Sequence, residues 1–113
     1  VQAAAATALT ESQDCVRELA ATYESRRNTL FRELANIGWE AKPSQGSFFA
    51  WLPVPKPYTS AEFADLLLER ANVMVAPGIG FGAHGEGYIR LGLLSSEERL
   101  KEAVRRIGAL NLF

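Results

Sequence analysis

Residues 73–94, VMVAPGIGFGAHGEGYIRLGLL, decide the fold of this chain. Two β-forming segments, 73–76 and 88–94, flank a stretch that contains five of the nine glycines. Short β-forming runs bounded by Pro and Gly are typical of strands joined by a tight loop. Because side chains alternate along a strand, the odd-numbered residues of the second segment are predicted to face a core and the even-numbered ones the opposite side.

Helices are predicted on both sides of this stretch. A capping box at Thr10–Gln13, followed by apolar residues at three- and four-residue steps, predicts one long helix that ends at Gly38. Two more capping boxes, at residues 59–62 and 95–98, predict the starts of two further helices. Asn72 is placed to close the first of these in the left-handed conformation.

Two aromatic-rich runs, 39–42 and 47–52, surround a Pro/Gly loop and predict a β-hairpin. The resulting order is α-β-β-α-β-β-α, which indicates an α+β fold and a single domain over residues 1–113. We expect a four-stranded antiparallel or mixed sheet with the helices packed on one face. The strand at 88–94 is expected to lie antiparallel between those at 47–52 and 73–76.

Composition excludes several classes of protein. The chain has 113 residues, is 48% hydrophobic, and has a net charge of −1 from 12 basic and 13 acidic residues, which is atypical of disorder. This charge offers no electrostatic attraction for nucleic acid or an anionic membrane, and no apolar run is long enough to span a bilayer. A single cysteine permits neither an internal disulfide nor a thiolate metal site, and suits the cytoplasm.

The first residues indicate that the chain is a piece of a longer one. Residues 1–9 are largely apolar, lack an initiator Met and lack a basic leader. They are typical of the middle of a helix, so we interpret the chain as a fragment or a processed product.

Arg90 is the residue with the most chemical information. It interrupts an apolar strand beside the glycine-rich loop, so it is either a solvent-facing arginine or a bidentate anchor for a carboxylate or phosphate.

The Gly-x-Gly-x-Gly run of the loop lacks the spacing of a dinucleotide fingerprint, and we expect a tight connection that packs Phe81 inward. In Gly46–Trp51 we expect two of the three aromatic residues in the core. None of the three lysines has an apolar context suited to Schiff-base chemistry.

Four motifs, in this order, resemble the C-terminal small domain of class I/II pyridoxal-phosphate aminotransferases, which are fold-type-I enzymes. They are YESRRN at 23–28, GSFFAW at 46–51, VMVAPGIGFG at 73–82 and GYIRLG at 87–92. The resemblance implies that Arg90 binds the substrate α-carboxylate, and that Gly46 and Phe48 border the substrate pocket. It implies no catalytic, cofactor-binding or metal-binding residue within this chain.

The same resemblance implies a parent enzyme that transfers an amino group between an L-amino acid and a 2-oxo acid. Pyridoxal 5′-phosphate, its Schiff-base lysine and its phosphate-binding groups would belong to a missing large domain, and residues 1–9 would end a helix continuing from it. The fragment alone would be inactive, and the parent would be a cytoplasmic homodimer.

The alternative from another class is a stand-alone regulatory module that binds an amino acid through Arg90 without catalysis. A purely structural role for Arg90 and the glycine loop is the third interpretation.

Overall fold

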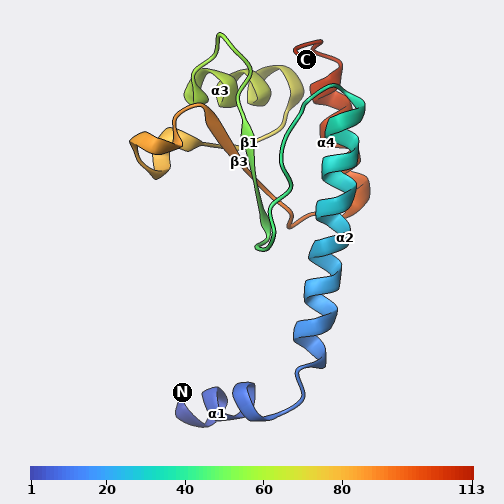
Figure 1. Ribbon diagram of the computed structural model, residues 1–113, viewed down its shortest axis with the longest axis vertical. Helices are drawn as coiled ribbons and strands as arrows, with labels where there is room; N and C mark the ends of the chain where they lie inside the picture. Colours follow the sequence, from blue (N-terminus) through green and yellow to red (C-terminus); the bar gives the residue numbers. More distant parts are fainter.

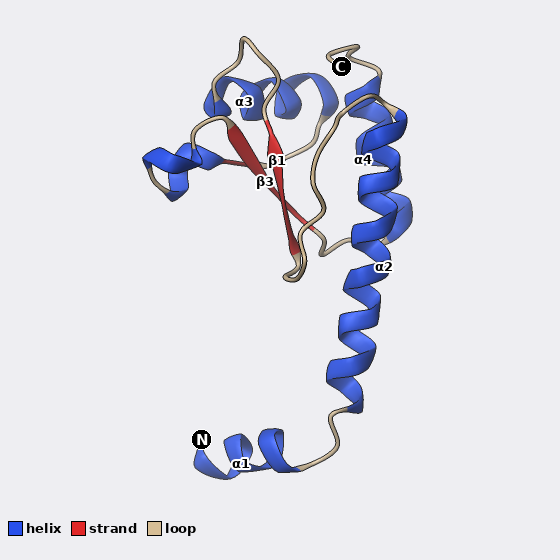
Figure 2. Cartoon of the chain, viewed as in Figure 1, coloured by secondary structure: helices blue, strands red, loops and turns tan.

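The computed structural model describes residues 1–113, in which four α-helices accompany a small antiparallel sheet (Figures 1 and 2). The elements are α1 (Gln2–Thr10), α2 (Asp14–Asn36), β1 (Phe49–Pro53), α3 (Ser60–Ala71), β2 (Ala76–Pro77), the 3₁₀ turns η1 (Gly78–Phe81) and η2 (Ala83–Gly85), β3 (Tyr88–Gly92) and α4 (Glu97–Gly108). The molecule measures 51 × 30 × 23 Å, because α1 and the first half of α2 project away from the body (Figure 1). The α+β class is therefore confirmed.

The sheet has three strands in the order β1-β3-β2, all antiparallel to their neighbours. Arg90 at the centre of β3 pairs with Trp51 on β1 and with Ala76 on β2. The predicted position of the strand around Arg90, antiparallel between the other two, is confirmed.

The predicted fourth strand at 39–42 does not form, and the four-stranded sheet was wrong. The outer edge of β1 bonds to side chains instead of to a neighbouring backbone. The indole Nε1 of Trp39 donates to the carbonyl of Pro53 at 2.9 Å, and the Ser44 hydroxyl donates to the carbonyl of Phe49 at 3.2 Å. These donors occupy the first and last outward carbonyls of β1, and the preceding segment forms no strand.

β2 is shorter than predicted and lies further along the chain than the expected strand at 73–76. The amide of Val73 donates to the carbonyl of Leu67 at 3.1 Å, which closes α3 instead of extending the sheet. Asn72 adopts the predicted left-handed conformation, with φ of 53°. The helix end therefore takes Val73, the first residue of the predicted strand.

The predicted capping box at Thr10–Gln13 is wrong, because Thr10 is the last residue of α1 and its hydroxyl donates to the carbonyl of Ala6 at 2.8 Å. The Gln13 side chain donates to the carbonyls of Ala8 and Glu11 at 2.9 and 3.0 Å, and so caps the end of α1. α2 then begins at Asp14 without a side-chain cap. The predicted end of the long helix is confirmed by Gly38, whose φ is +84°.

The capping box at 59–62 is confirmed. Thr59 accepts from the amide of Glu62, and the Glu62 carboxylate accepts from the amide of Thr59 at 2.8 Å. The third box does not form: Ser96 instead of Ser95 is the N-cap of α4, its hydroxyl accepts from the amide of Arg99 at 3.4 Å, and no reciprocal side-chain bond accompanies it.

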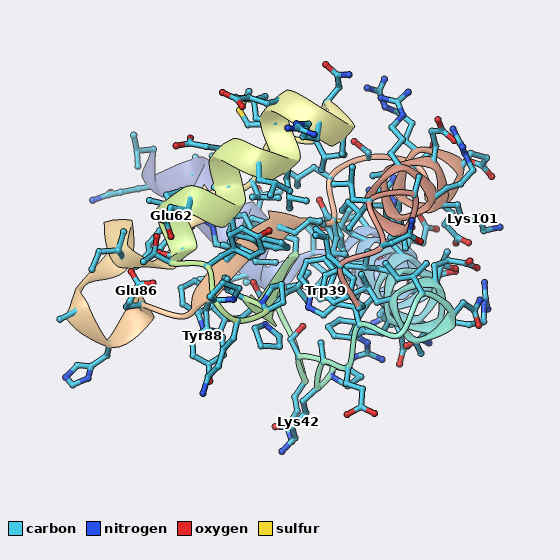
Figure 3. The ribbon with its side chains drawn as sticks, turned by 90° about the horizontal axis from the view of Figure 1, so that it is seen from above. Trp39, Lys42, Glu62, Glu86, Tyr88 and Lys101 are labelled. Carbon is cyan, nitrogen blue, oxygen red and sulfur yellow. The ribbon has the colours of Figure 1, made fainter.

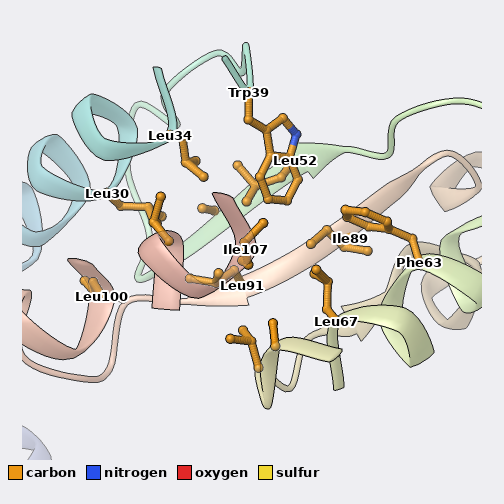
Figure 4. Close-up of a cluster of buried hydrophobic side chains, with 14 of the residues drawn as sticks. Leu30, Leu34, Trp39, Leu52, Phe63, Leu67, Ile89, Leu91, Leu100 and Ile107 are labelled. Atoms are coloured by element: carbon orange, nitrogen blue, oxygen red, sulfur yellow. The ribbon is translucent and has the colours of Figure 1, made fainter. Parts of the chain in front are cut away.

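The core lies between one face of the sheet and the helices α2, α3 and α4 (Figure 4). The strands contribute Ala50, Leu52, Ile89 and Leu91, none more than 6% exposed. The helices contribute Leu30, Leu34, Phe63, Leu67, Ala71, Leu100, Val104 and Ile107. The predicted apolar faces of α3 and α4 and the predicted alternation along β3 are thus confirmed.

Only the second half of α2 takes part in this core. Leu30 and Leu34 are 1% exposed, whereas Val16 and Leu19 on the same predicted face are 56% and 55% exposed. The first half of the helix extends beyond the sheet (Figure 1), so Val16 and Leu19 stay more than half exposed, and only Tyr23 further along it packs against a ring, that of Phe48. No helix of the structure combines the length and the hydropathy needed to cross a membrane.

Candidate functional site

The guanidinium of Arg90 lies on the face of the sheet opposite the helices, against two aromatic rings. Its central carbon is 4.1 Å from the centroid of the Phe49 ring and 4.3 Å from that of Phe81. The half-buried side chain forms no ion pair and no hydrogen bond within the chain. A guanidinium carries five N–H donors in one plane and stacks on aromatic faces. Arg90 is thus a positioned cation whose donors the chain leaves free.

Two further aromatic residues complete this surface. The Trp51 ring lies edge-on to Phe81 at a centroid distance of 5.7 Å and stacks on Tyr88 at 5.8 Å. We call Phe49, Trp51, Phe81 and Tyr88 the open-face aromatic cluster. Because aromatic surroundings are weakly polar, a hydrogen bond between Arg90 and an anion is stronger here than in bulk water.

The glycine-rich loop folds back on itself and does not wrap around a phosphate-sized space. A Cβ atom on Gly78 would lie 1.9 Å from the carbonyl oxygen of Gly85, and one on Gly85 would lie 2.0 Å from the carbonyl oxygen of Gly78. Only glycine permits this approach. The expectation that the loop packs Phe81 inward is wrong, because the Phe81 side chain is 52% exposed and rests on the open face.

Glu86 fastens this loop to the first turn of α3. Its carboxylate accepts from the amide and hydroxyl of Ser60 at 2.7 and 3.0 Å and from the amide of Gly87 at 2.9 Å. The hydrogen bonds from these two amides hold the pKa of Glu86 below its ordinary value of 4.5. Figure 3 shows Glu86 beside Glu62 at this end of α3. A carboxylate at the first turn is also favoured by the helix dipole.

Gly46 and Phe48 lie apart from Arg90, in the chain that leads into β1. Both line a cavity of about 650 Å³ with Val16, Leu19 and other residues of α2, and Arg90 is not among its lining residues. The Phe48 ring packs against Tyr23 at 5.8 Å and against Phe49 at 4.5 Å. Phe48 is therefore linked to Arg90 through the ring of Phe49, whereas Gly46 is exposed and has no such link.

Sequence reasoning missed most of what surrounds Arg90. Phe49 and Trp51 occupy odd positions of β1 and so share the open face, although two of the three aromatic residues of 46–51 were expected in the core. The alternation of β1 could have shown this, since Ala50 and Leu52 are the residues at 0% exposure. Glu86 and its partner on α3 carry no local signal, because they are 26 residues apart in the sequence.

The residues of this chain do not fit a pyridoxal-phosphate site by themselves. Such a cofactor requires a lysine for the Schiff base beside the substrate anchor. Lys42, Lys56 and Lys101 are all exposed, and Figure 3 shows Lys42 and Lys101 directed away from the body of the domain. The structure likewise contains no group of three or more His, Cys, Asp or Glu side chains suited to a metal ion.

Comparisons with known proteins agree with this geometry. Residues 1–107 match the family model described as aminotransferase class I and II. The chain is 63% identical over 112 residues to the L-glutamine–4-(methylsulfanyl)-2-oxobutanoate aminotransferase of Bacillus subtilis, covering 99% of this chain and 28% of that protein. It is 41% identical over 107 residues to the LL-diaminopimelate aminotransferase of Moorella thermoacetica, covering 95% of this chain and 27% of that protein. The chain thus spans little more than a quarter of these relatives.

Solved structures of the same kind share the fold. BacF of Bacillus subtilis in its apo form superposes with a TM-score of 0.91 at 35% identity, over 96% of this chain and 28% of that one. The aromatic aminotransferase of Pyrococcus horikoshii superposes with a TM-score of 0.87 at 33% identity, over 95% of this chain and 30% of that one. The open face with Arg90 therefore belongs to a fold that aminotransferases share, and the chain is a member of the class I and II aminotransferase family, whose enzymes use pyridoxal 5′-phosphate.

Proposed function

We propose that residues 1–113 are the C-terminal small domain of a longer pyridoxal-phosphate-dependent aminotransferase, in which Arg90 binds the α-carboxylate of the substrate. The observation that carries this proposal is the guanidinium of Arg90, which lies against two rings and has no partner among the residues of the chain. A carboxylate matches two parallel N–H groups of a guanidinium, and a fixed guanidinium orients the amino acid for proton abstraction at Cα.

Two observations support a missing large domain. The chain corresponds to about 28% of its relatives' length. The apolar residues Val16 and Leu19 of α2 are also more than half exposed, as expected of a surface that another part of the protein covers. In this proposal residues 1–9 end a helix that continues from that domain, which supplies the Schiff-base lysine and the phosphate-binding groups.

The substrates proposed are an L-amino acid and a 2-oxo acid. Because a relative with 63% identity is an L-glutamine–4-(methylsulfanyl)-2-oxobutanoate aminotransferase, we propose this donor and acceptor as the first pair to assay. Phe48 and Gly46 would border the substrate pocket, with Phe48 beside the Phe49 ring that lies against Arg90. A homodimeric and cytoplasmic parent completes the proposal; the single, exposed cysteine is compatible with a reducing compartment.

The test is Arg90→Ala in the full-length protein that carries this domain. We expect kcat/KM for the amino acid to fall by the equivalent of about 2–5 kcal/mol, because the substrate carboxylate loses its charged partner. Arg99→Ala is the matched control, since Arg99 is an exposed arginine on α4 without an ion pair. Equal activity of Arg90→Ala and Arg99→Ala would refute the role of Arg90.

The stand-alone regulatory module has no support from the comparisons, in which the reported relatives are aminotransferases. Turnover by the full-length protein separates the two ideas. A regulatory module would bind its amino acid without any turnover, whereas the small domain of an aminotransferase contributes to a measurable transfer rate in the full-length protein.

A further inference from the structure

The rings of Phe49 and Phe81, which lie against Arg90, are positioned by different parts of the fold. Phe49 belongs to β1 and is placed by the backbone ladder to β3, where it pairs with Gly92. Phe81 lies outside the sheet, at the end of η1 in the glycine-rich loop. The position of Phe81 therefore depends on whatever fixes this loop.

One buried serine joins the loop at both of its ends. Ser60, at 0% exposure, donates from its hydroxyl to the Glu86 carboxylate at 3.0 Å, and the same hydroxyl accepts from the amide of Ile79 at 3.3 Å. Ile79 lies two residues before Phe81 and Glu86 five residues after it. Ser60 and Glu86, which we call the loop clamp, thus anchor both sides of the segment that carries Phe81.

From this arrangement, which rests on the proposed function, we infer that Phe81 is a positioning residue for Arg90 and that the loop clamp holds Phe81 in place. An arginine side chain samples many rotamers, and a ring on which it stacks restricts the orientation of its plane. With rings against the guanidinium, a carboxylate approaches along its N–H edge. That approach is the one that forms two parallel hydrogen bonds.

The inference predicts an effect on carboxylate binding that is separate from folding. In the full-length protein, Phe81→Leu keeps the apolar bulk but removes the ring, whereas Phe81→Tyr keeps the ring. We expect Phe81→Leu to weaken binding of 4-(methylsulfanyl)butanoate, measured by calorimetry, by roughly threefold to tenfold, the loss of one cation–π contact. Phe81→Tyr should bind within about twofold of the unaltered protein, because its ring remains.

Glu86→Gln tests the loop clamp. The neutral amide keeps the shape but loses the charge-assisted hydrogen bonds to Ser60, so a smaller loss of affinity in the same direction is expected. His84→Ala is the matched control within the loop, because His84 is exposed and forms no side-chain hydrogen bond. It should leave the affinity unchanged.

Turnover of 3-(methylsulfanyl)propylamine, which lacks the carboxylate, separates positioning from general damage. We expect Phe81→Leu to leave kcat/KM for this amine unchanged while lowering it for L-methionine. Equal losses for both substrates, or equal affinities for the Leu and Tyr variants, would overturn the inference. A loss in Arg90→Ala without any loss in Phe81→Leu would overturn it and leave the proposed function standing, whereas no loss in Arg90→Ala would refute the proposed function itself.

Discussion

The two faces of the sheet consist of alternate residues of the same strands, yet one is buried and apolar and the other is open and carries Arg90. The covered face consists of Ala50, Leu52, Ile89 and Leu91, which are apolar and at most 6% exposed. The open face carries a cation without a partner and rings such as those of Trp51 and Phe81, which are 37% and 52% exposed. Because the buried residues of one face stabilise the fold, the other face is free to present Arg90 at a fixed position.

The largest difference in unfolding free energy is expected between substitutions of Leu52 and Trp51, neighbouring residues whose side chains lie on opposite faces of the sheet. Leu52→Ala should lower the free energy of unfolding by about 3–5 kcal/mol, because it leaves a cavity in the centre of the core. Trp51→Ala should lower it by only about 1–2 kcal/mol, since it removes ring contacts on a partly exposed surface. Urea unfolding of the two variants measures both values, and the reverse ranking would break the comparison of the two faces.

The second-largest loss of unfolding free energy is expected from a substitution in the glycine-rich loop. Gly78→Ala should cost about 1–3 kcal/mol of unfolding free energy, because the new Cβ would meet the carbonyl oxygen of Gly85 at 1.9 Å. Gly80→Ala is the matched control, since a Cβ there meets nothing within 4 Å. If the two variants unfold at the same urea concentration, the close approach of the loop to itself contributes nothing to stability.

The smallest effect concerns pH and the Glu86 carboxylate. Its pKa is lowered in the folded state by the amides of Ser60 and Gly87, so the ionised form stabilises the fold. This contribution is fully present above the ordinary pKa of 4.5 and is lost as the pH falls through the lowered, folded value. Glu86→Gln should therefore flatten the dependence of unfolding free energy on pH below 4.5.

Glu69→Gln provides the comparison for this titration. Glu69 lies on α3 as an exposed carboxylate that accepts no hydrogen bond, so Glu69→Gln makes the same change of charge without altering the loop clamp. Parallel pH profiles for the two variants would show that the loop clamp has no electrostatic role in stability.

Local signals were enough to predict much of the framework. The capping box at Thr59, the left-handed Asn72 and the apolar spacing of α3 and α4 are determined by residues within one or two helical turns. The alternation around Arg90 likewise predicted which side of β3 faces the core. The failures arose where distant atoms compete for the same group, as when the Trp39 indole takes a β1 carbonyl that a fourth strand would have used.

The same contrast between local signals and contacts of distant residues applies to the candidate site. Arg90 could be selected from the sequence because a charge in an apolar strand is a local anomaly, and its proposed role comes from the family resemblance. The rings of Phe49 and Phe81, and the clamp between Ser60 and Glu86, could not be selected, since no pattern in the sequence relates residues of separate segments.

Local sequence patterns were enough for the core faces of the strands, the caps of α3 at Thr59 and Asn72 and the selection of Arg90, because hydrogen bonding and hydrophobic periodicity act over a few residues. Only the tertiary structure decided that the sheet has three strands, that Phe81 faces outward and that the first half of α2 stands clear of the core. These features depend on which segments meet in space. That outcome follows from the packing of the whole chain, in which each donor and each apolar surface has several possible partners.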